Sequence, residues 1–95
     1  METLQALVRF HKALGDETRL RLIALLARQE PGGAMCVGRL AKELETTISN
    51  VSQHLRVLKD LGLVCSERRG RRIHYFLDTA QIAYYRTLTR ELLGP

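Results

Sequence analysis

The sequence contains no tryptophan, two cysteines and two prolines, and no apolar run near the ~18–20 residues that a membrane span requires. Its N-terminal residues lack the basic stretch and the apolar core of a secretory signal. Two cysteines, Cys36 and Cys65, are too few for a disulfide framework and favour a reducing compartment. We therefore expect a cytoplasmic protein with no membrane partner.

Catalytic motifs are also missing from the sequence. There is no glycine-rich phosphate loop, no metal-binding triad and no nucleophile placed beside a base. A chain of 95 residues is expected to form one domain, residues 1–95, with a small core and no obvious deep pocket. The sequence therefore predicts a single-domain protein that is not an enzyme and for which self-association is a natural source of stability.

The positive charge is concentrated in the second half of the chain. Residues 48–77 contain six basic and two acidic residues, a net charge of +4, whereas the whole chain carries +5. A solvated surface spreads its charge, whereas a site for a polyanion gathers it. This stretch is therefore typical of nucleic-acid binding, with an ordinary basic surface as the alternative.

The pattern of apolar residues predicts a mainly α-helical fold with a small β-hairpin. Helices are expected at residues 3–14, 17–28, about 40–44, 48–61 and 79–93, and the hairpin at 63–77. Asp16, Thr47 and either Asp78 or Thr79 are suited to cap three of these helices. Residues 29–33 form the clearest break, and residues 34–37 form a short extended stretch that is a candidate edge strand. Short helices followed by a basic hairpin describe a winged helix-turn-helix.

The helix at residues 48–61 has the outward face expected of a DNA-reading helix. With Val51 at the centre of the buried side, a turn of about 100° per residue brings small polar side chains and one arginine to the outside. Such side chains suit base edges and phosphates, whereas a merely solvated face is usually rich in lysine and glutamate. The predicted DNA-contacting residues of this helix and its cap are Thr47, Ser49, Asn50, Ser52, Gln53 and Arg56.

The hairpin tip is the second candidate DNA-contacting element. Arg68, Arg69, Arg71 and Arg72 surround Gly70, which can adopt a positive φ in a tight turn. Arginines there can contact phosphates or enter a minor groove. The alternative is a charged strand edge that deters aggregation, but proteins more often build such an edge with lysine.

Three segments in the same order resemble the ArsR/SmtB family of winged-helix repressors. They are residues 13–23 (ALGDETRLRLI), 51–64 (VSQHLRVLKDLGLV) and the end of the hairpin at 70–75 (GRRIHY). The resemblance extends from about Leu7 to Leu93. It implies a homodimeric transcriptional repressor that leaves a palindromic operator in double-stranded DNA when it binds an inducer.

The resemblance also implies that the first and last helices pair across the dimer. Their apolar stripes allow this independently, because they would be exposed on a monomer of this size. The predicted interface residues are Leu4, Leu7, Val8, Ile82, Tyr85, Leu88 and Leu92.

The sequence departs from the family at the places where the inducer is sensed. Arsenic, cadmium and lead sensors of the family often carry Cys-Val-Cys at the third helix, whereas this chain has Cys36-Val37-Gly38. Zinc and nickel sensors place Asp and His ligands on the last helix, which has no histidine here. A soft metal or metalloid ion needs two to four thiolates, and the only other cysteine is Cys65. Pairing of residues 35–37 with the hairpin could bring the two thiols together, and oxidation of Cys36 is the other sensing hypothesis. The alternative to both is that Cys36 is only a small apolar packing residue, since free cysteine is among the most buried residue types.

Two alternatives to an inducible repressor remain open on the sequence. One is a winged-helix module that binds protein rather than DNA, for which an apolar or acidic face at residues 49–56 would be expected. The other is a regulator that binds DNA constitutively and senses nothing.

Overall fold

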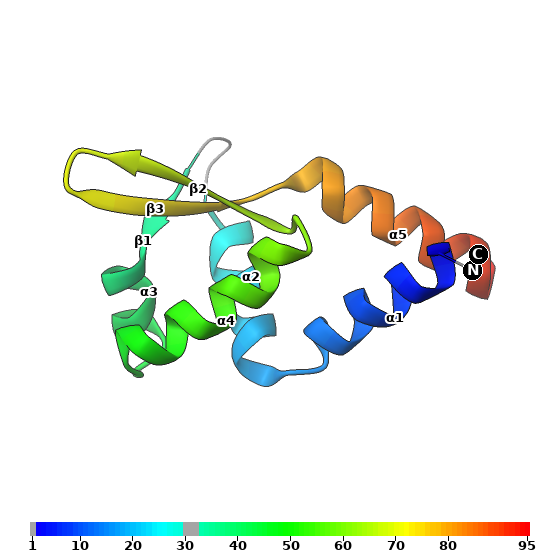
Figure 1. The fold of residues 1–95 in the computed structure, drawn as a ribbon, viewed down its shortest axis with the longest axis horizontal. Helices are drawn as coiled ribbons and strands as arrows, with labels where there is room; N and C mark the ends of the chain where they lie inside the picture. The colour runs from blue at the N-terminus through cyan, green and yellow to red at the C-terminus, as the bar shows by residue number, and fades with distance from the viewer. Residues whose placement is uncertain (1, 30–32) are drawn as a thin grey trace.

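The computed structural model describes residues 2–29 and 33–95, which form five helices and a three-stranded antiparallel sheet (Figure 1). In chain order the elements are α1 (Glu2–Leu14), α2 (Glu17–Ala27), β1 (Met35–Cys36), α3 (Val37–Glu43), α4 (Ile48–Asp60), β2 (Val64–Arg69), β3 (Arg72–Leu77) and α5 (Thr79–Leu93). The predicted helix boundaries agree within one residue except for the third helix, which begins earlier than expected. Residues 30–32 of the predicted break lie outside the described residues.

The residues predicted to cap the N-termini of three helices do so. Asp16 Oδ1 accepts a hydrogen bond from the Arg19 amide at 3.1 Å, and Thr47 Oγ1 accepts one from the Asn50 amide at 3.0 Å. Asp78, not Thr79, caps α5, because its Oδ1 accepts a hydrogen bond from the Gln81 amide at 3.0 Å. Each cap satisfies an amide that has no partner within its own helix.

The sheet has the order β1-β3-β2, so the short extended stretch pairs with the second strand of the hairpin. Gly70 and Arg71 form the turn between paired residues Arg69 and Arg72, and Gly70 has φ +65°. A positive φ is strained for a residue with a side chain, which explains a glycine at this point. The hairpin projects as a wing beyond α3, at the opposite end of the molecule from the α1–α5 pair (Figure 1).

One hydrophobic core holds the helices and the base of the sheet together. Leu22, Leu40, Val51, Leu58 and Leu63 are fully buried and come from α2, α3, α4 and the segment before β2. The helix pair α3 and α4 is therefore packed against both α2 and the base of the wing. This packing holds the outer face of α4 at a defined angle to the hairpin.

The expectation that all the apolar residues of α1 and α5 are exposed in a single chain is wrong for two of them. Leu7 is only 5% exposed and Tyr85 only 6%, because α1 and α5 pack against each other within the chain. Phe10 stacks on Tyr85 with ring centroids 4.6 Å apart and an interplanar angle of 9°. Leu4, Val8 and Leu92 remain exposed, and Ile82 and Leu88 are partly buried.

Candidate nucleic-acid interface

Helix α4 presents to solvent nearly all the polar residues that the sequence indicated. Ser49, Ser52, Gln53 and Arg56 are exposed, whereas Val51, Leu55 and Leu58 face the core. Two predicted contacts have an additional structural role: the Thr47 hydroxyl caps the helix, and Asn50 Nδ2 donates a hydrogen bond to Thr46 Oγ1 at 3.1 Å. The outer face of α4 is therefore polar, uncrowded and anchored at its N-terminus.

Arg19 of α2 helps to hold α4 in position through contacts away from its solvent-exposed face. Its Nε donates to the Ala13 carbonyl at 2.6 Å, which closes the turn between α1 and α2. Its guanidinium also lies 3.2 Å from His54 Nδ1 on α4, and Asp16 Oδ1 lies 3.8 Å from the same nitrogen. His54 is therefore a hydrogen-bonding residue at the edge of the core. This cluster links Asp16 and Arg19, both in the segment that resembles the family, to helix α4.

The wing and α3 enclose a cationic cleft of about 820 Å³ next to α4. Arg71 and Arg72 of the hairpin line it, and Ser52 of α4 contributes to its wall. All four wing arginines are exposed, and among the described residues only Arg69 has an acidic partner, Glu67 at 3.6 Å. The charges of the wing are therefore available to a polyanion that lies along α4.

Two basic residues that the sequence did not single out line the same cleft, and one exposed apolar residue lies at the start of α4. Arg39 and Lys42 of α3 line the cleft beside the wing arginines. Ile48, at the start of α4, is 54% exposed and offers an apolar contact of the kind that a thymine methyl group accepts. The charge count could have indicated Arg39 and Lys42, but only the packing of α3 against the sheet shows that they face the wing.

One basic residue of the charged stretch has a structural role. Lys59 Nζ donates a hydrogen bond to the Ser66 hydroxyl at 2.7 Å, which joins the end of α4 to strand β2. This bond fixes the wing relative to α4, so the lysine is less available to a ligand than the arginines at the tip.

The two cysteines are kept apart by the sheet. Cys36 on β1 is opposite His74 and Cys65 on β2 is opposite Phe76, so strand β3 lies between them. Two strand spacings separate their Cα atoms by roughly 10 Å or more, beyond the reach of a disulfide. The hypothesis that pairing of residues 35–37 with the hairpin brings both thiols to one site is therefore wrong within a chain.

The donor set also does not fit a soft-metal site within one chain. In residues 2–29 and 33–95, no group of three or more histidine, cysteine, aspartate or glutamate side chains is arranged to hold a metal ion. Soft ions require several thiolates in reach of one another, and each cysteine here lacks a second one. We therefore assign no metal to this surface.

The two thiols differ in their electrostatic surroundings. The pKa of Cys36 is held below its usual range by the backbone N–H of Arg39 and by the nearby guanidinium of Arg72. The pKa of Cys65 is raised by burial and by the Asp78 carboxylate, whose Oδ2 lies 3.9 Å from the sulfur. Cys36 is therefore the thiol with the greater thiolate fraction, and it lines the cationic cleft.

Comparison with known proteins identifies the family. The sequence profile described as "Bacterial regulatory protein, arsR family" matches residues 16–66, which run from the α2 cap to the middle of β2. The HTH-type transcriptional regulator Rv2034 of Mycobacterium tuberculosis is 40% identical over 99% of this chain and 89% of its own length. The chain belongs to the ArsR family. The family resemblance predicted from the three sequence segments is confirmed.

Further relatives of this ArsR-family chain are also transcriptional regulators. A transcriptional repressor SmtB homolog of Synechocystis is 38% identical over 97% of the chain and 67% of its own length. The structure of an ArsR-like transcriptional regulator from Rhodococcus superposes with a TM-score of 0.82 and 29% identity, covering 99% of this chain and 84% of the other.

The homodimeric winged helix-turn-helix DNA-binding domain Mb0332 of Mycobacterium bovis superposes with a TM-score of 0.74 and 28% identity, covering 90% of this chain and 77% of its own. The predicted winged helix-turn-helix fold is confirmed. In the part of the ArsR-family chain that the structure describes, no helix has the length and apolar character to cross a bilayer.

Proposed function

We propose that this ArsR-family protein is a sequence-specific transcriptional repressor that binds double-stranded DNA in the cytoplasm. The observation that carries the proposal is the continuous surface formed by the outer face of α4, the cationic cleft and the wing. Helix α4 is the element that enters the major groove, where base pairs are distinguishable. The wing arginines and the basic residues of α3 contact phosphates on either side and fix the orientation of α4.

Replacing Gln53 tests the assignment of base reading to α4. Gln53 is exposed on the outer face and its amide can bond a base edge with both its donor and its acceptor. Gln53→Ala should lower affinity for the preferred operator by about 1–3 kcal/mol while leaving affinity for unrelated DNA almost unchanged. Fluorescence anisotropy with both DNA types measures this difference. Equal affinity and equal selectivity in wild type and variant would remove α4 from the reading role.

We infer that the repressor acts as a two-fold homodimer built from α1 and α5. Leu4, Val8 and Leu92 form an exposed apolar surface on this helix pair, and exposed apolar surfaces favour association. The M. bovis relative is homodimeric, which supports the same arrangement here. A two-fold dimer presents its two α4 helices to half-sites about one helical turn of DNA apart, or a small multiple of that distance.

We infer that the inducer, where one acts, modifies Cys36. Its thiol lines the cleft that also contains Arg39 and Arg72, and its lowered pKa favours the reactive thiolate. Hydrogen peroxide transfers an oxygen atom to the thiolate, which gives a sulfenic acid and hydroxide, and a second peroxide converts the sulfenic acid to the charged sulfinate with release of water. Such groups would compete with DNA phosphates for the arginines of the cleft.

The reactivity of the two cysteines provides a test of this sensing hypothesis. At neutral pH, iodoacetamide should alkylate Cys36 faster than Cys65, since the pKa of the first thiol is lowered and that of the second is raised. Peroxide should release operator DNA from wild type and from Cys65→Ser, but not from Cys36→Ser. Equal release from Cys36→Ser would make Cys36 a packing residue only. Release by cadmium but not by peroxide would replace oxidation with a metal as the inducer.

A further inference from the structure

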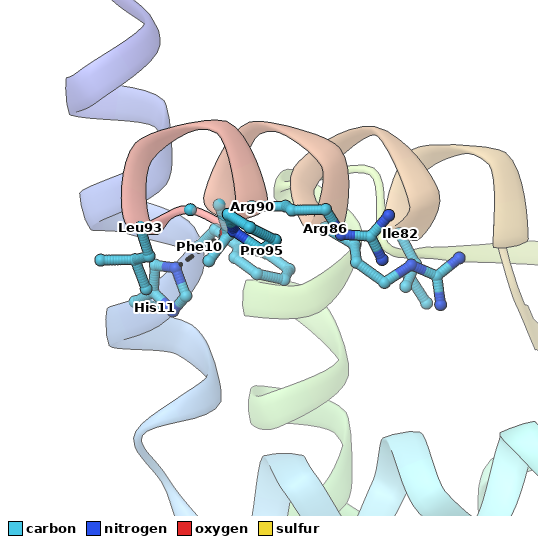
Figure 2. Close-up of a pocket in the computed structure, with 9 residues that line it drawn as sticks. Phe10, His11, Ile82, Arg86, Arg90, Leu93 and Pro95 are labelled. Atoms are coloured by element: carbon cyan, nitrogen blue, oxygen red, sulfur yellow. Dashed lines mark hydrogen bonds between the residues drawn. The ribbon is translucent and has the colours of Figure 1, made fainter.

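A second cavity lies far from the DNA surface, between the two terminal helices. It has a volume of about 460 Å³, within the range of small-molecule sites. Phe10 of α1 and Ile82 and Leu93 of α5 provide an apolar lining (Figure 2). Phe10 is fixed in place by its stacking on Tyr85, so this floor is rigid. The groove can therefore accept an apolar group without rearranging the core.

The rim of this groove is positively charged. Arg86 and Arg90 of α5 line it, and both are exposed (Figure 2). Among the described residues, neither arginine has an acidic side chain within 4.0 Å. Like charges four residues apart on a helix repel each other, and an anion between them would remove that repulsion. Helix α5, which carries both arginines, extends away from the wing (Figure 1), so DNA binding does not account for them.

A third polar group at the groove has a defined orientation. The Thr89 hydroxyl donates its only proton to the Tyr85 carbonyl at 2.8 Å, so it must accept from His11 Nε2, which lies 3.1 Å away. His11 therefore carries a proton on Nε2 and stands with its ring edge toward Phe10, at an interplanar angle of 74°. The wall of the groove is fixed by hydrogen bonds as well as by packing.

We propose that this groove binds a small apolar carboxylate. The apolar part of the ligand lies on Phe10, Ile82 and Leu93, and its carboxylate lies between Arg86 and Arg90. Guanidinium groups bind carboxylates through paired, charge-assisted hydrogen bonds, and the apolar floor supplies the hydrophobic contact. This combination favours a molecule with both features over inorganic phosphate, which lacks the apolar part, and over neutral hydrocarbons, which lack the charge.

A second copy of the chain fits this groove less well than a carboxylate does. In a two-fold interface centred on this groove, Arg86 and Arg90 would be brought toward their own equivalents. Leu4, Val8 and Leu92 of the apolar surface proposed for dimerisation lie outside this groove; the pocket that they line shares His11 with it, and Ile82 of the predicted interface also lines the groove. The charged groove and the neutral dimer surface therefore have different partners.

Binding at this groove would act on the two helices that we propose to form the dimer, and this regulatory consequence rests on the proposed function. A ligand in this groove contacts both α1 and α5, so it would alter how these helices pack against those of the second chain and hence the distance between the two α4 helices. The carboxylate would then act as an effector of operator affinity from a site that touches no DNA.

Titration calorimetry with octanoate tests the binding site itself. Octanoate should bind the 95-residue chain saturably, at one molecule per chain. The double variant Arg86→Gln/Arg90→Gln should weaken this binding at least tenfold, since it removes the charged partners of the carboxylate. The matched control Arg21→Gln/Arg28→Gln removes two exposed arginines of α2 and its C-terminal cap, and should leave binding unchanged. Octanol should bind far more weakly than octanoate and show no difference between the variants.

The contradicting outcomes are distinct. Unsaturable octanoate binding, or equal weakening in both double variants, would overturn the carboxylate site. Loss of octanoate binding at concentrations where sedimentation shows a dimer would mean that a second copy covers the groove, which also overturns it. Operator binding without octanoate, measured by anisotropy, tests the proposed function separately. Octanoate that binds at the groove without changing operator affinity would overturn the effector role alone.

Discussion

Replacing Arg71 and Arg72 with alanine should weaken binding of operator and unrelated DNA alike and reduce its dependence on salt. Each arginine that contacts a phosphate displaces about one counterion, so the slope of log affinity against log salt should flatten by about two units. Over the range from about 50 to 200 mM salt, the affinity lost by the variant relative to wild type should be largest at the lowest salt concentration, where counterion release contributes most. Both side chains are exposed on the cleft beside α4, so the folded structure should not change.

The control for the wing variant removes the same charge elsewhere. Arg21→Ala/Arg28→Ala lowers the net charge by the same amount on α2, away from the cleft, and should leave the slope nearly unchanged. Anisotropy titrations at four or more salt concentrations give both slopes. Equal slopes in wild type and the wing variant would mean that Arg71 and Arg72 serve only as a solubilising surface.

Replacing Leu92 with glutamate should break the dimer and cause a large loss of operator affinity. Leu92 is 60% exposed at the end of α5, and a charge there would be buried without a partner in a two-fold interface. A monomer binds one half-site only, so the loss of the linked second contact should lower affinity on the order of 10²–10⁴-fold. Affinity for an isolated half-site should hardly change, because α4 and the wing are intact.

Sedimentation equilibrium checks the dimer directly, and Leu20→Glu is its matched control. Leu20 is 50% exposed on α2 and outside the terminal helices, so this variant should remain a dimer. A wild-type chain that is monomeric at micromolar concentration and still binds a palindrome with full affinity would contradict the proposed assembly.

Features that depend on neighbouring residues were predictable from the sequence. Asp16, Thr47 and Asp78 act as caps through atoms three residues away, and Val51 and Leu55 identify the buried side of α4 by spacing alone. The wing turn was predictable for the same reason, since its geometry depends on Gly70 and its two strands.

Features that depend on tertiary arrangement were not predictable. The separation of Cys36 from Cys65 follows from strand β3 lying between them, and no local pattern specifies that order. Leu7 and Tyr85 have the helical spacing of the predicted interface residues, but contacts between α1 and α5 bury their side chains within the chain. Arg39 and Lys42 became part of the candidate interface only through the packing of α3 beside the wing.

Selection of bound sequences from a random DNA library tests the central claim most directly. A two-fold repressor that reads bases through α4 should enrich a palindromic sequence, with half-sites about one helical turn apart or a small multiple of that spacing. Selection with Gln53→Ala should relax the preference at one or two positions of each half-site. No enrichment over the starting library, at a salt concentration where the chain binds DNA, would contradict sequence-specific recognition by this protein.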